Sequence, residues 1–366
     1  MPIEDQIREH VSLAPMTTLG VGGAARRYTE IASVEELQAL LALAGQNGWP
    51  VQMLGAGSNI LCSDEGLDAL VVRWRATEIK VRRRGPSVRL RVAAGCDWDE
   101  LVARSVNEGW AGIECLSGIP GTVGAAPIQN IGAYGQEVAE VVSCVHLLRL
   151  PGGEAISLNA DACGFTYRDS LFKREAGWIV TAVELHLVAG GPASVRYAEI
   201  ERSLAQRELA PTLANVRETV LSIRATKGML LDHADPESRS AGSFFMNPIV
   251  TTREAKELAA KFDAAMPSWP VDEHATQRKL SAAWMIEHCG FEKGQRLGGA
   301  RISRKHVLAL VNGGEAKARD LLDLAREIQR AVLERTSVRL DVEPRLLGFS
   351  PEELGELGTT ARQSSS

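Results

Sequence analysis

The chain has 366 residues, of which 45% are hydrophobic and 24% charged, and its formal net charge is −5. This length is large for one hydrophobic core, so two or three domains are expected. The acidic balance excludes a surface built to follow a nucleic-acid backbone, which needs an excess of Lys and Arg. No apolar run approaches the roughly 18 residues of a membrane span, and residues 1–13 lack the apolar core of a signal peptide.

The six cysteines form no C-x-x-C pair, and neither they nor the seven scattered histidines show metal-ligand spacing. We therefore predict no metal site. Free structural thiols are typical of a reducing compartment, so the expected location is the cytoplasm. We also expect a monomer that does not insert into a membrane.

The first third of the chain alternates helices and strands. Ser33 and Glu36 have the spacing of a capping box ahead of an apolar periodic run, which predicts the start of a helix. The apolar run 51–54 predicts a buried strand, and a second helix is predicted from Asp97 to Gly109.

The segment 73–91 is rich in arginine. After a Gly85-Pro86 turn, apolar residues alternate with arginines over 88–92, which favours a half-exposed strand over a phosphate-binding patch.

Beyond residue 190, helical patterns dominate. They predict helices over 216–226, 252–262, 277–289 and 316–335. A last alternating strand is predicted over 338–342, with Arg339, Asp341 and Glu343 on its polar face. Residues 352–366 are expected to fray.

Three glycine-rich segments are candidates for ligand binding. Residues 20–25 match the dinucleotide fingerprint superficially but lack the strand that should precede it, so this site is rejected. Residues 54–59 follow an apolar strand directly, and their N–H groups could turn inward on an anion; a plain glycine-rich turn is an equal alternative. The longest segment, 118–135, is too long for an ordinary connection and too apolar for a linker. It is expected to wrap around a large flat ligand.

The segments GAGSN and GIPGTVGAAPIQNIGAYG together resemble the FAD-binding domain of the vanillyl-alcohol-oxidase type. The second is close to its form in UDP-N-acetylenolpyruvoylglucosamine reductases. The resemblance implies non-covalently bound FAD. The predicted cofactor-binding residues are Leu54, Gly55, Ala56, Gly57, Ser58, Asn59, Ile119, Pro120, Gly121, Thr122, Gly124, Ala125, Gln129, Asn130, Gly132, Ala133 and Tyr134.

Three further motifs are similar to those of the reductase family: residues 165–173, 241–248 and 342–344. They imply that Arg168, Ser243 and Glu343 are catalytic. Arg168 would stabilise the enolate-like charge, Ser243 would deliver a proton, and a protonated Glu343 could donate a hydrogen bond nearby. The family often has Glu-Pro-Glu where this chain has Glu343-Pro344-Arg345, so a second acid is missing.

Without the family, other interpretations of these residues stay open. Arg168 could form a surface ion pair of little value, Ser243 could be a turn or capping residue, and Glu343 could face solvent.

The resemblance extends to a tyrosine loop that closes over the uridine nucleotide in longer members of the family, and Tyr197 matches it; packing is the alternative. The predicted substrate-binding residues are Tyr134, Tyr167, Tyr197, Lys227, Asn247 and His306. His306 stands where other members carry Gln, so its role is open.

The expected fold is α+β, with a two-subdomain FAD-binding module and a C-terminal α+β substrate-binding domain. The predicted boundaries are 1–75, with the segment 338–366 returning to it, then 76–228 and 229–337. The implied reaction uses NADPH to reduce FAD, which then reduces UDP-N-acetylglucosamine enolpyruvate to UDP-N-acetylmuramate for peptidoglycan synthesis. The alternatives are an FAD-dependent oxidase of the same fold and a non-catalytic flavin- or nucleotide-binding protein.

Overall fold

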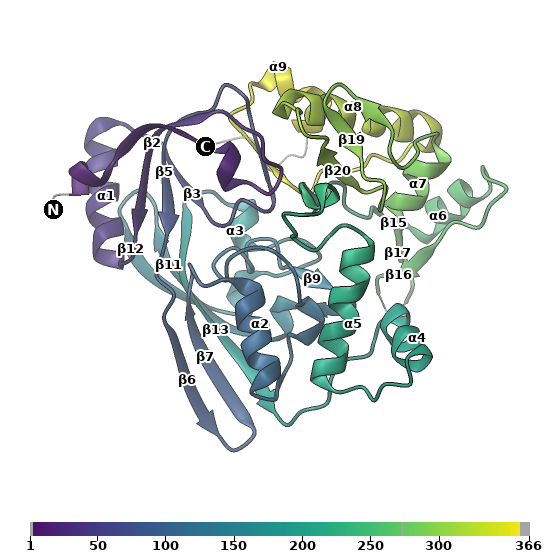
Figure 1. Ribbon diagram of the computed structural model, residues 1–366, viewed down its shortest axis with the longest axis horizontal. Helices are drawn as coiled ribbons and strands as arrows, with labels where there is room; N and C mark the ends of the chain where they lie inside the picture. Colours follow the sequence, from purple (N-terminus) through teal and green to yellow (C-terminus); the bar gives the residue numbers. More distant parts are fainter. Residues whose placement is uncertain (1–2, 273, 359–366) are drawn as a thin grey trace.

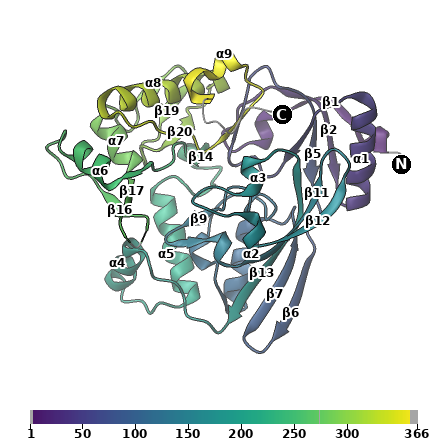
Figure 2. The same ribbon diagram turned by 180° about the vertical axis from the view of Figure 1, so that it is seen from behind.

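The structure is a computed structural model that describes residues 3–272 and 274–358 (Figures 1 and 2). Helices and strands are mixed along the chain, which confirms the α+β class. The helices are α1 (Val34–Asn47), α2 (Trp98–Asn107), α3 (Leu171–Arg174), α4 (Ala198–Gln206), α5 (Leu213–Thr226), α6 (Thr252–Ala259), α7 (Ala282–His288), α8 (Ala318–Thr336) and α9 (Pro351–Leu354).

The first sheet has four strands in the order β1 (Arg8–Ser12), β2 (Ala24–Ile31), β5 (Leu67–Trp74) and β3 (Val51–Leu54). Strand β1 is antiparallel to β2, and the other pairs are parallel. Helix α1 lies against this sheet (Figure 1). The Ser33 side chain accepts from Glu36 N, and the Glu36 carboxylate accepts from Ser33 N, so the predicted capping box is confirmed.

The second sheet has six antiparallel strands. Its order is β12 (Glu154–Asn159), β11 (Val142–Arg149), β13 (Trp178–Ala189), β7 (Ser87–Ala93) and β6 (Ile79–Arg84), with β8 (Trp110–Ala111) also on β13. The β6–β7 hairpin projects away from the rest of the molecule (Figure 1). On β7, Val88 and Leu90 are buried while Arg89 and Arg91 are exposed, which confirms the predicted half-exposed strand. Asp97 accepts from Glu100 N and caps α2 as expected.

The remaining strands form small sheets. One is β14 (Ser240–Ser243), β20 (Ala309–Asn312), β19 (Ala300–Ile302) and β18 (Arg296–Leu297); another is β15 (Ile249–Thr251), β17 (Gln277–Leu280) and β16 (Ser268–Pro270); a third is β10 (Gln136–Glu137) with β9 (Gly132–Ala133). Helix α8 packs within this C-terminal core. Its first N–H groups, from Ala318 and Arg319, donate to the Asp64 carboxylate at 2.8 and 3.0 Å. This cap joins two parts of the chain, because Asp64 lies just before β5.

The C-terminal segment returns to the N-terminal part of the fold. Strand β21 (Arg345–Leu347) pairs in parallel with β4 (Ile60–Cys62). The domain boundaries given above stay a prediction, and residues 359–366 of the expected frayed tail lie outside the described residues.

Two predicted elements are wrong. Residues 277–280 are strand β17 instead of the start of a helix, because Ser281 accepts from Trp284 N and caps α7 only there. Residues 338–342 form no named strand; only Val342 makes a bridge, to Phe245. Here the main chain bonds to a loop instead, with Met246 N donating to Asp341 O at 2.9 Å.

Within the described residues, no helix combines the length and the hydropathy that crossing a bilayer requires.

Candidate active site

A cavity of about 2150 Å³ lies where the glycine-rich segments face the C-terminal strands. It exceeds the roughly 300–1,000 Å³ of a typical small-ligand pocket, so it has room for a large cofactor and a second ligand together. Most of the predicted site residues line it. They are Leu54, Gly55, Ala56, Gly57, Ser58, Asn59, Ile119, Pro120, Gly121, Thr122, Ala125, Gln129, Gly132, Ala133, Tyr134, Tyr167, Arg168, Tyr197, Lys227, Ser243, Asn247, His306 and Glu343.

The loop after β3 presents main-chain groups to this cavity. The N–H groups of residues 56–59 donate to no other described residue, so they are available to an anionic ligand. Gly57 has φ +65°, and a Cβ there would lie 2.0 Å from the Met16 carbonyl oxygen. The loop conformation therefore requires glycine at this position.

Side chains tie the two glycine-rich segments together. Ser58 Oγ donates to Pro120 O at 2.8 Å, and Asn59 Nδ2 donates to Gln129 Oε1 at 2.6 Å. Asn59 Nδ2 also lies 3.3 Å from the carbonyl oxygen of Glu343. These contacts join the two segments into one wall of the cavity.

Two residues predicted to bind the cofactor do not line the cavity. Gly124 packs against the segment after β7, where a Cβ would lie 2.5 Å from that of Ala94. Asn130 is buried, and its amide donates to Glu137 Oε2 at 2.7 Å and to Thr166 O at 3.0 Å. In this structure both residues shape the segment from behind, and their role in cofactor binding stays a prediction.

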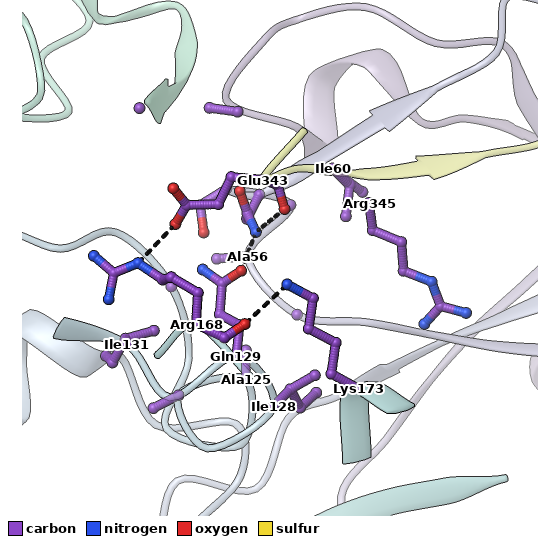
Figure 3. Close-up of a pocket in the computed structure, with 18 of the residues that line it drawn as sticks. Ala56, Ile60, Ala125, Ile128, Gln129, Ile131, Arg168, Lys173, Glu343 and Arg345 are labelled. Atoms are coloured by element: carbon purple, nitrogen blue, oxygen red, sulfur yellow. Dashed lines mark hydrogen bonds and ion pairs between the residues drawn. The ribbon is translucent and has the colours of Figure 1, made fainter. Parts of the chain in front are cut away.

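Arg168 and Glu343, far apart in sequence, form an ion pair at the cavity wall. Arg168 Nε lies 3.1 Å from Glu343 Oε1, and the two side chains are only 19% and 14% exposed (Figure 3). Arg168 Nη2 also donates to Gly132 O at 2.6 Å. Arg168 is therefore no surface ion pair of little value, and Glu343 does not face solvent. In this arrangement Glu343 is the ion-pair partner of Arg168, whereas we expected it to donate a hydrogen bond.

Ser243 ends β14 beside this pair. Its hydroxyl makes no hydrogen bond to another described residue, and it caps no described helix, so the capping interpretation is not supported. The next residue, Phe244, accepts from Glu343 N at 2.9 Å. The main chain thus places Ser243 and Glu343 on neighbouring segments with the serine hydroxyl free for a ligand.

Tyr134 and Tyr197 meet at another part of the wall. Their ring centroids are 5.4 Å apart in an edge-to-face arrangement, and Tyr197 is 41% exposed. Burial raises the pKa of Tyr134 to about 12, so its phenol stays protonated. Lys227 Nζ lies 5.8 Å from the Tyr134 ring centroid and 2.7 Å from Glu199 Oε2.

Burial, followed by the positive charges of Lys227 and Lys293, lowers the pKa of His306 to about 4. The imidazole is neutral, and its Nδ1 accepts from Leu308 N at 3.2 Å. The proton of the neutral ring therefore lies on Nε2, which makes His306 a hydrogen-bond donor.

Tyr167 and Asn247 lie close to each other in the cavity wall. Burial raises the pKa of Tyr167, which also bonds to the Asn247 backbone. Asn247 Oδ1 accepts from Ala282 N at 2.9 Å, so its side chain helps to begin α7.

Several cations in the wall were not predicted, among them Arg224 and Lys279. Arg224 is buried and donates to Gly118 O at 3.1 Å and to Met229 O at 2.7 Å. Lys279 Nζ lies 4.8 Å from the Tyr167 ring, and burial followed by the charge of Arg168 lowers its pKa. Arg224 lies on α5 and Lys227 is its C-cap, and their i, i+3 spacing could have indicated that both face the cavity. Nothing in the sequence indicated Lys279.

Comparison with known proteins explains this arrangement. A family model described as "FAD binding domain" matches residues 25–159, and one described as "UDP-N-acetylenolpyruvoylglucosamine reductase, C-terminal domain" matches residues 235–347. The UDP-N-acetylenolpyruvoylglucosamine reductase of Thermobifida fusca is 42% identical, over 93% of this chain and 98% of its own. This chain belongs to the UDP-N-acetylenolpyruvoylglucosamine reductase family.

Other members of the reductase family agree. The enzyme of Salinispora arenicola is 44% identical over 92% of this chain and 94% of its own. The crystal structure of the Thermus caldophilus reductase matches with a TM-score of 0.66 and 27% identity, covering 93% of this chain and 100% of that one. The family and the FAD-binding domain expected from the motifs are therefore confirmed.

Proposed function

We propose that this protein reduces the enolpyruvyl group of UDP-N-acetylglucosamine enolpyruvate to give UDP-N-acetylmuramate, with NADPH as reductant and FAD as hydride carrier, in peptidoglycan precursor synthesis. The observation that carries the proposal is the Arg168–Glu343 ion pair beside the free Ser243 hydroxyl, on the wall of one large cavity.

The residues present fit FAD. The free N–H groups of residues 56–59 suit its pyrophosphate, and the small residues of the 118–135 segment allow a flat ring close to the backbone. When bound, FAD supplies the chemistry of accepting a hydride from NADPH and passing it to the vinyl carbon. The protein contributes binding, orientation and electrostatics.

Arg168 stabilises the negative charge that develops next to the substrate carboxylate. A fixed cation in a half-buried site lowers the energy of such a charge without reorganising during the reaction. The contacts from Arg168 to Glu343 and to the Gly132 carbonyl hold the guanidinium in place. Glu343 thus acts through Arg168 in this arrangement, as a positioning residue.

Ser243 donates the proton that completes the lactyl ether. Its hydroxyl is not used by another described residue, and it lies beside the segment that carries Glu343. A positioned proton donor is typically worth about 10²–10⁴-fold in rate. Tyr134, Tyr197, Lys227, Asn247 and a donating His306 would bind the nucleotide sugar.

The test is NADPH oxidation measured anaerobically with and without the enolpyruvyl nucleotide. We expect turnover only when the nucleotide is present, with UDP-N-acetylmuramate as the product. Turnover that needs oxygen and no nucleotide would establish the oxidase alternative, and the absence of any turnover would favour the binding protein.

The state of the flavin gives a second test. The only histidine on the described cavity wall is His306, and no cysteine lies there. We therefore expect yellow protein that releases its colour into the supernatant on acid precipitation. Colour retained in the pellet would mean a covalent flavin and would support the oxidase alternative. The monomeric state and the cytoplasmic location belong to the same proposal.

A further inference from the structure

Glu114 is a buried carboxylate behind the two tyrosines of the cavity. It lies in the short 3-10 helix Glu114–Leu116, is 1% exposed, and forms no ion pair with a described residue. Three N–H donors satisfy it instead. Gly112 N donates to Oε2 at 2.8 Å, while Gln136 Nε2 and Ser194 N both donate to Oε1, at 3.0 and 2.7 Å.

The donors to Oε1 belong to the two segments that carry the tyrosines. Gln136 follows Tyr134 by two residues, and Ser194 precedes Tyr197 by three. The neighbouring residue Cys115 repeats the connection: its N–H donates to Gln136 Oε1 at 2.8 Å, and its Sγ lies 3.4 Å from Ser194 O. Both segments are thus attached to one turn of 3-10 helix.

The rest of the connection from β13 to α4 is held less firmly. Next to β13, Gly190 N donates to Gly109 O at 2.8 Å. Near Tyr197, Arg196 forms an ion pair with Glu140, and the two side chains are 57% and 40% exposed. Such exposed pairs contribute little. Tyr197 is 41% exposed, whereas Glu114, which accepts from Ser194 N, is 1% exposed. The segment therefore has a fixed base at Ser194 and a freer tip at Tyr197.

We infer that Glu114 is a positioning residue for the nucleotide sugar, whose carboxylate holds the base of the 190–197 segment to the Tyr134 turn. This inference rests on the proposed function. Because one oxygen atom accepts from both segments, moving either segment breaks a hydrogen bond to a buried charge. Glu114 thereby holds together the two segments whose tyrosines, Tyr134 and Tyr197, are in edge contact, and Glu114 itself does not line the cavity.

The test is Glu114→Gln. An amide has a single acceptor oxygen, so in either orientation at least one of the three donors faces an NH₂ group. We expect KM for the enolpyruvyl nucleotide, and Kd for UDP-N-acetylmuramate by calorimetry, to rise about tenfold. Reduction of the flavin by NADPH should change by less than about twofold, because no donor to the Glu114 carboxylate lies in residues 54–59 or 118–133. The control is Glu108→Gln, at an exposed carboxylate that ends α2.

Unchanged nucleotide binding in Glu114→Gln, or equal slowing of both half-reactions, would overturn the inference. If the variant does not fold, residue-resolved hydrogen exchange of the wild-type enzyme decides. The Ser194 amide should be protected without nucleotide, whereas the amides of 195–197 gain protection only when UDP-N-acetylmuramate binds. Exchange of Ser194 as fast as those amides would overturn the inference. If the wild-type enzyme bound no nucleotide sugar, the proposed function would fail. Protection of the Ser194 amide would then still test whether Glu114 holds the base of the 190–197 segment.

Discussion

The wall of the cavity that we propose for the flavin and the wall that we propose for the nucleotide are built differently. The flavin wall, residues 54–59 and 118–133, presents backbone N–H groups and small residues, fixed by contacts such as Ser58 to Pro120. The nucleotide wall presents long side chains from several elements, among them Tyr134, Tyr197 and Lys227. A backbone wall depends on its conformation, whereas a side-chain wall depends on individual groups. A substitution in the flavin wall should therefore disturb the conformation of the whole wall. A substitution in the nucleotide wall should remove a single contact.

The largest effect is expected at the junction of the two walls. Ser243→Ala should leave flavin reduction by NADPH near normal but slow reoxidation by the enolpyruvyl nucleotide by roughly 10²–10⁴-fold, because the methyl group cannot donate a proton. Stability should change by at most about 1 kcal/mol, since the hydroxyl has no partner among the described residues. Stopped-flow spectroscopy of each half-reaction measures this. Equal slowing of both phases would mean that Ser243 shapes the flavin site.

On the flavin wall, Gly57→Ala should destabilise the protein by more than about 2 kcal/mol, because it combines left-handed backbone with a steric clash. FAD content should fall with it. The matched control is Gly85→Ala at the β6–β7 turn, where φ is +59° but nothing lies within 4 Å of the added Cβ. Thermal unfolding and the ratio of flavin to protein absorbance test this. Equal losses in the two variants would show that the contact with Met16 is unimportant.

On the nucleotide wall, Tyr197→Phe should weaken nucleotide binding by about 0.5–1.5 kcal/mol, the value of one hydrogen bond. The phenyl ring keeps its edge contact with Tyr134, so folding and FAD content should not change. Calorimetric titration with UDP-N-acetylmuramate gives the affinity. An unchanged Kd would return Tyr197 to a packing role and would weaken the contrast between the walls.

The smallest effect concerns pH and His306. Its folded pKa, about 4, lies below its ordinary value of 6.5. Between these values the unfolded chain binds a proton that the native protein does not, so stability falls as pH falls through this window. His306→Gln should make the loss of Tm from pH 6.5 to 4 smaller, while the exposed His233→Gln should not. A pH profile identical to that of the wild type would show that His306 is not held neutral.

Local chemistry made several features predictable. The capping residues Ser33 and Asp97 began their helices where expected, since a cap depends on neighbours three residues away. The glycine-rich segments also identified the flavin wall, because backbone that approaches a ligand closely needs glycine. Helix 277–289 failed for the converse reason: tertiary pairing of β17 with β15 overrode the helical periodicity.

By itself, the sequence determined the fold class and the family, and most of the site residues that it predicted line the cavity, because these depend on residue type and order. Only the tertiary structure decided how they act together. It paired Arg168 with Glu343 and attached both tyrosine segments to Glu114. It also moved Gly124 and Asn130 behind the cavity wall. The physical reason is that partners distant in sequence meet only when sheets and loops pack, so no local pattern carries their distances.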